Sequence, residues 1–158
     1  MKEYTPEYLE HIRRIIHSDD KEQAVRELAD LHPADIAELY QNLEIDEAEY
    51  LYRLLDDDTA ADVLMELDED DRLKLISDMP AEEIAKQIDH LDTDDAVDLI
   101  QQLDVDEREE ILSHIDDVEQ AGDIIDLLKY DEDTAGGLMG TEMIVVNENW
   151  SMPEGIKE

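Results

Sequence analysis

Large apolar residues recur every twelve positions along most of the chain. The first series comprises Leu31, Leu43, Leu55, Leu67, Met79, Leu91, Leu103, Ile115 and Leu127. A second series lies nine positions further into each repeat, at Tyr40, Tyr52, Leu64, Ile76, Ile88, Ile100, Leu112 and Ile124. A third lies eight positions in, at Leu39, Leu51, Val63, Leu75, Leu99 and Ile111, with Gln87 as its polar exception. Such offsets describe one buried stripe on each of a succession of short helices.

The series predict an all-α fold, a superhelical solenoid of short helices with a repeat of about 12 residues. Alternate repeats resemble each other most, so we expect a helix pair of about 24 residues to be the structural unit, stacked on its neighbours. A single coiled coil is the alternative, and a helix breaker or cap in every repeat speaks against it. Near the N-terminus, Thr5 and Pro6 open a helix that reaches about Ile16, and residues 18–20 open another.

Acidic residues stand where helix caps are expected. Asp56, Asp68, Asp92, Asp104 and Asp116 each come directly after a member of the first series. Asp is a preferred N-cap, and acids in the first turn face the positive end of the helix dipole. We therefore interpret most of the carboxylates as caps and solvated helix faces.

The charge balance narrows the range of partners. The chain has 158 residues, 48 of them acidic and 12 basic, for a net charge of −36. Nucleic acids and anionic membrane surfaces are excluded as partners, because both are bound through Lys and Arg. The absence of Cys excludes disulfides and thiolate metal sites. The longest apolar run, residues 143–146, is too short to cross a bilayer, so we expect a cytoplasmic chain that does not insert in a membrane.

Some acids have no capping role and face other acids four positions away on one helix side. These acid-on-acid pairs are Asp58–Asp62, Asp94–Asp98 and Asp106–Glu110, whereas the same offsets elsewhere hold the acid–lysine pairs Asp70–Lys74 and Glu82–Lys86. Each like-charged pair costs about 0.2–0.5 kcal/mol in an isolated helix. Asp62 and Asp98 have apolar neighbours in the chain, so we expect them at the edge of the packed stripe. A divalent cation would relieve the repulsion, and carboxylates alone select Mg²⁺ or Ca²⁺. The alternative is that the pairs are solvated surface.

The twelve-residue pattern stops at Tyr130, where Asp131 to Met139 introduce two adjacent glycines. A short apolar strand at 143–146 and a helix opening at 151–154 follow. We therefore expect a helical superhelix over residues 1–130, a connector over 131–140, and the beginning of a second domain over 141–158.

The segments HPADIAEL (32–39) and YDEDTAGGLM (130–139) resemble the cytosolic region of MgtE-type magnesium transporters and channels. The resemblance covers nearly the whole chain and identifies residues 141–158 as the start of a CBS domain. It implies a cytoplasmic domain of a homodimeric protein anchored in the bacterial cell membrane, attached to CBS and transmembrane domains of the same chain. In that family Mg²⁺ bridges the acidic N and CBS domains and favours the closed pore.

Carried over to this sequence, the resemblance implies Mg²⁺ ligands at Asp62, Asp94 and Asp98, with the backbone carbonyl of Gly137. Asp58 and Asp95 are neighbours that could assist, and Mn²⁺ or Ca²⁺ are expected substitutes for Mg²⁺. The competing hypothesis is an acidic protein-binding solenoid, similar to flagellar motor switch proteins, without an ion-sensing role. No nucleophile–base constellation is present, so we do not expect an enzyme.

Overall fold

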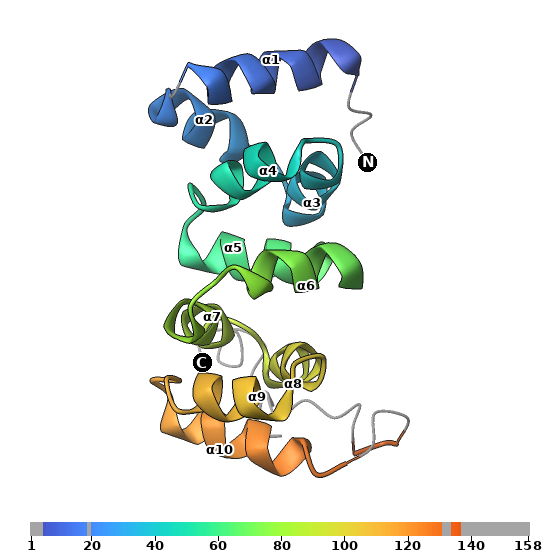
Figure 1. The fold of residues 1–158 in the computed structure, drawn as a ribbon, viewed down its shortest axis with the longest axis vertical. Coiled ribbons are helices and arrows are strands. Elements are labelled where there is room, and N and C mark those ends of the chain that lie inside the picture. Colours follow the sequence, from blue (N-terminus) through green and yellow to red (C-terminus); the bar gives the residue numbers. More distant parts are fainter. Residues whose placement is uncertain (1–4, 19, 131–133, 137–158) are drawn as a thin grey trace, which may run out of the picture.

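The computed structural model describes residues 5–18, 20–130 and 134–136, and within these ranges ten α-helices and no strands are formed. The helices are α1 (Pro6–His17), α2 (Lys21–Leu28), α3 (Pro33–Gln41), α4 (Ile45–Tyr52), α5 (Asp57–Glu66), α6 (Glu69–Ser77), α7 (Ala81–Ile88), α8 (Thr93–Gln101), α9 (Val105–Leu112) and α10 (Val118–Leu127). Figure 1 shows them as an elongated stack with α1 at one end and α10 at the other. The predicted all-α superhelix is confirmed for this part of the chain, while residues 141–158, the expected CBS start, lie outside it.

The first apolar series marks the connectors between the helices. Leu31, Leu43, Leu55, Met79 and Leu91 each follow the end of a helix, and each backbone N–H bonds to the carbonyl oxygen three residues earlier, at 2.9–3.2 Å. Their side chains turn inward and pack in or against the core. At these five positions a leucine or methionine therefore closes the preceding helix with one tight turn and anchors the connector.

Helices two apart in the chain pack side by side. Four such pairs are in contact, α3 with α5, α5 with α7, α7 with α9 and α8 with α10, and at the N-terminal end α1 packs on α2 and α4, and α3 on α4. This arrangement confirms the expected two-helix unit, because equivalent helices of successive units stack on one another. One apolar core runs the length of the stack, from Ile12 in α1 to Leu127 in α10.

The predicted caps are confirmed with one correction. Asp56, Asp68, Asp92 and Asp104 are the N-cap residues of α5, α6, α8 and α9. The expectation for Asp116 was wrong: the next residue, Asp117, caps α10 and accepts the N–H groups of its first turn at 2.9 and 3.1 Å. The connector after α9, residues 113–117, is longer than those between the other helices and places Ile115 in the core, so the cap falls one position later.

Two arginines stabilise helix C-termini, a role that the sequence reasoning did not find. Arg72 of α6 donates to three carbonyl oxygens at the end of α5, at 2.8–3.0 Å. Arg108 of α9 donates to two carbonyl oxygens at the end of α8, at 2.5 and 2.7 Å. Because each arginine is the fifth residue after a member of the first apolar series, its charge meets the unpaired, negative end of the preceding helix.

Candidate metal site

The acids of α8 are presented on the side of the helix that faces away from the core. Thr93, Ala96, Val97, Leu99 and Ile100 are buried. The remaining positions of the first turns place Asp94 and Asp98 in solvent and leave Asp95 half-buried. Asp92 caps the helix beside them. Four carboxylates thus lie within seven consecutive residues at one end of α8.

Asp95 is the electrostatically strained member of this group. Burial raises its pKa above the ordinary value of 3.8, and the negative charges of Asp94, Asp92 and Asp98 raise it further. Arg72 acts in the opposite direction but does not cancel the shift. The folded protein therefore holds a carboxylate in surroundings that disfavour its charge. Oxygen donors held under such repulsion suit a hard divalent cation.

The acids of α5 are arranged differently. Asp58, in the first turn, lies 2.6 Å from Nδ1 of His90 in the connector between α7 and α8. This contact joins α5 to the connector that leads into α8, across 32 positions of sequence. Asp58 thus has a partner that the acid-on-acid pattern did not predict.

Two expectations about the acids were wrong. Asp62 and Asp98 are exposed rather than at the edge of the core, because both point outward from the sides of α5 and α8 opposite the packed stripe. Lys74 pairs with Asp71 at 3.0 Å instead of with Asp70, since the i,i+3 partner on α6 lies nearer. The pair Glu82–Lys86 is confirmed, at 3.6 Å.

The predicted ligands do not converge within the described residues. Among residues 5–18, 20–130 and 134–136, no three His, Asp or Glu side chains are grouped so that they could hold a metal ion. Gly137, the predicted carbonyl ligand, lies outside these ranges. The acids of α8 therefore form a solvent-exposed group of oxygen donors on one side of the helix, with no further ligands opposite them among the described residues.

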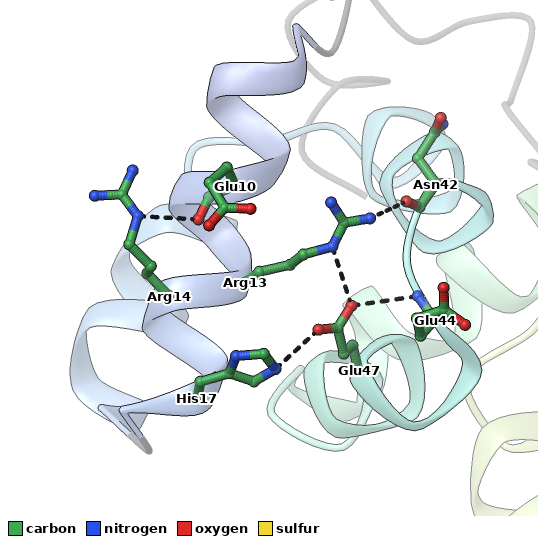
Figure 2. A network of polar contacts seen from close by, with 7 residues as sticks. All are labelled: Glu10, Arg13, Arg14, His17, Asn42, Glu44 and Glu47. Atoms are coloured by element: carbon green, nitrogen blue, oxygen red, sulfur yellow. Dashed lines mark hydrogen bonds and ion pairs between the residues drawn. The ribbon is translucent and has the colours of Figure 1, made fainter.

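A charge network centred on one buried carboxylate, which the sequence reasoning missed, lies at the other end of the stack (Figure 2). Glu47 of α4 has a side chain that is only 11% exposed. It accepts from Nε of Arg13 at 3.4 Å and from the backbone N–H of Glu44 at 3.3 Å, and it lies 3.0 Å from Nε2 of His17. Arg13 also donates to the carbonyl oxygen of Asn42 at 3.2 Å. The network fastens α1 to α4 and leaves no carboxylate oxygen of Glu47 free for a metal ion.

The stacked helix pairs and the acidic outer face define an all-helical solenoid domain. Its family follows from the sequence: residues 31–133 match the family profile described as the MgtE intracellular N domain. This segment makes up more than half of the chain, and the chain therefore belongs to the MgtE intracellular N domain family. Helices α1 and α2 precede the matched segment.

Five chains of solved structures match this chain, among them the following two. The soluble part of a magnesium transporter is 27% identical, with a TM-score of 0.74 over 86% of this chain and 54% of its own. The cytosolic domain of the Mg²⁺ channel MgtE, in complex with ATP, is 24% identical, with a TM-score of 0.76 over 85% of this chain and 55% of its own. The present chain thus spans about half the length of these relatives. No curated protein matches.

The family assignment settles two expectations. The domain is intracellular by the family's own description, as predicted. By its family the domain is not an enzyme, as expected. Within the described residues, every helix is too short or too polar to serve as a membrane span.

Proposed function

We propose that this chain is the Mg²⁺-sensing regulatory domain of a magnesium transporter or channel. Membership of the MgtE intracellular N domain family supports the assignment, as does the likeness to the soluble part of a magnesium transporter. The observation that carries the sensing role is the grouping of Asp92, Asp94, Asp95 and Asp98 on the outer side of α8. Burial, and then the charges of the other three acids, raise the pKa of Asp95 within this group.

The proposed mechanism is charge neutralisation. When Mg²⁺ is scarce, the acidic face of α8 repels other acidic surfaces, in a chain whose net charge is −36. When Mg²⁺ is plentiful, ions held by Asp94 and Asp98 of α8 and Asp62 of α5, with the Gly137 carbonyl, offset that repulsion. Asp58 and Asp95 assist them. Mn²⁺ and Ca²⁺ are expected to substitute, because they too take oxygen ligands.

The remaining ligands would come from a CBS domain of the same, longer chain, in a homodimeric membrane protein. The one-sided placement of the α8 acids fits this division, since the opposite half of the coordination sphere is left for a second domain. Mg²⁺ biases gating only through a higher affinity for the compact, closed state than for the open one. The isolated domain is accordingly expected to bind Mg²⁺ weakly.

Thermal melts in MgCl₂ and in NaCl at matched ionic strength test the proposal, on this chain and on the longer protein with its CBS domains. Mg²⁺ at ten times its dissociation constant should stabilise by about 1.4 kcal/mol beyond the effect of NaCl. The double variant Asp94→Asn with Asp98→Asn should lose most of this excess. The matched control is Asp106→Asn with Glu110→Gln, the acid pair with the same spacing on α9.

Equal stabilisation by the two salts in the longer protein would contradict the proposal and favour the competing hypothesis of an acidic adaptor. Equal losses in the two double variants would mean that Mg²⁺ screens the overall charge and does not bind at α8.

A further inference from the structure

A groove with an apolar floor lies between α6, α7 and α9, apart from the acids of α8. Its volume is about 310 Å³, within the range of small-ligand sites. The floor is formed by Ile76, Ile84 and Ile111, each at most 5% exposed, with Leu103 from the connector before α9. None of the acids proposed for Mg²⁺ lines it.

The rim of the groove is acidic on its α9 side. Asp104, Glu107 and Glu110 line it and are exposed. Arg108 is the one basic residue of α9, and its guanidinium is bonded to backbone carbonyls at the end of α8. Glu110 has no cationic partner among the described residues, so the rim keeps its negative charge.

Gln102 adds a polar group to the same wall. Its side-chain oxygen is buried and accepts no hydrogen bond from the described part of the chain. Buried acceptors are normally paired, because water is no longer available to them. A ligand N–H donor would supply the missing partner if the Gln102 side chain turned its oxygen toward the groove.

We propose that this groove binds a small amphipathic organic cation, with an alkyl or aryl body and an ammonium or guanidinium head. The body would cover the isoleucines of the floor, and the head would face Glu110 and the oxygen of Gln102. The acidic rim repels anions. A bare metal ion would gain nothing from the apolar floor, because apolar side chains are not metal ligands. A second copy of the chain is disfavoured by its net charge of −36.

Calorimetric titration of the chain with n-alkylammonium ions, from ethyl to octyl at 150 mM NaCl, tests the proposal. Each added methylene should tighten binding about fourfold until the floor is covered, because each buries apolar surface. Glu110→Gln should weaken binding of every member about threefold. Glu109→Gln is the matched control: Glu109 is an exposed neighbour on the same helix that does not line the groove, so its loss should change binding little.

Dissociation constants that do not depend on alkyl length would overturn the proposal, because attraction to the overall negative charge of the protein does not depend on the length of the alkyl chain. Equal effects of Glu110→Gln and Glu109→Gln would do the same. Alkyl sulfates of the same lengths should not bind. Asp94→Asn with Asp98→Asn should leave alkylammonium binding unchanged, which separates this groove from the proposed Mg²⁺ site.

Discussion

The hydroxyl of Tyr52 lies 3.4 Å from the side-chain oxygen of Gln87, inside the core and across 35 positions of sequence. The same hydroxyl donates to the carbonyl oxygen of Ala60 at 3.0 Å. Gln87 is the polar exception in an otherwise apolar series, and this contact places its amide beside a polar partner. Burial raises the pKa of Tyr52 well above its ordinary value of 10.0, so the hydroxyl keeps its proton and acts as a donor.

Tyr52→Phe should destabilise the domain by about 1–3 kcal/mol, because the Ala60 carbonyl loses its donor and the Gln87 amide loses its neighbour in the core. Urea denaturation at equilibrium measures the change. Adding Gln87→Leu, which restores the apolar residue of the series, should recover part of the loss. Tyr130→Phe, at a half-exposed ring, should stay within about 0.5 kcal/mol of wild type. Equal losses at the two tyrosines would refute a special role for the buried hydroxyl.

Glu47→Gln should loosen the N-terminal helices. The change removes the charge that pairs with Arg13 and His17, and we expect a cost of about 2 kcal/mol, less than for a fully buried pair because Arg13 is one-third exposed. Hydrogen exchange should speed up in α1 and α2 and stay constant in α7 to α10. Glu22→Gln is the control, because its pair with Arg26 is exposed and worth about 0.3–0.5 kcal/mol. Uniform faster exchange along the whole stack would argue against a local fastening.

Asp56→Ala should cost about 1 kcal/mol, because it removes the N-cap of α5. Hydrogen bonds from the Thr59 backbone and hydroxyl hold the pKa of Asp56 below its ordinary value of 3.8. A depressed pKa means that the stabilisation is complete above pH 3.8 and disappears as the pH falls through the lower, folded-state value. The difference between wild type and variant should therefore shrink in acid denaturation series between pH 5 and pH 2. Asp57→Ala, which removes only a dipole contact, should show no such pH dependence in that comparison.

Asp95→Asn should stabilise the domain at pH 7 by about 0.5 kcal/mol when divalent ions are absent, the scale of a relieved like-charge contact. The raised pKa of Asp95 means that the folded state binds its proton more tightly than the unfolded state. The free-energy cost of holding a charged Asp95 in the folded state is thus present above the folded-state pKa and vanishes below pH 3.8. The stabilisation by Asp95→Asn should therefore vanish below pH 3.8 too. Urea denaturation in EDTA at several pH values measures it. A destabilised variant at pH 7 would show that Asp95 is needed for its attraction to Arg72 instead.

The periodic sequence predicted the elements of this fold well for a local reason. A large apolar residue every twelve positions allows one short helix and one turn, and in four units the Asp that follows it caps the next helix. Helix positions therefore follow from neighbours in the chain. Two of the failures were also local: Asp117 replaced Asp116 as a cap, and Lys74 pairs with Asp71 in place of Asp70. Both concern single steps of the backbone that the spacing leaves open.

By itself the sequence determined a stack of short acidic helices, the family of the chain and the helix that carries Asp94 and Asp98. Only the tertiary structure decided which carboxylates are paired, strained or free. The partner of Asp58 is His90, 32 positions away, and the partners of Glu47 are Arg13 and His17, 34 and 30 positions away. These residues come together only when the helices stack. The half-burial of Asp95 depends likewise on how α8 lies against its neighbours. The ion-pair partners and the half-burial of Asp95 depend on the rotation between successive units. That rotation arises from side-chain packing, and a twelve-residue spacing does not determine it.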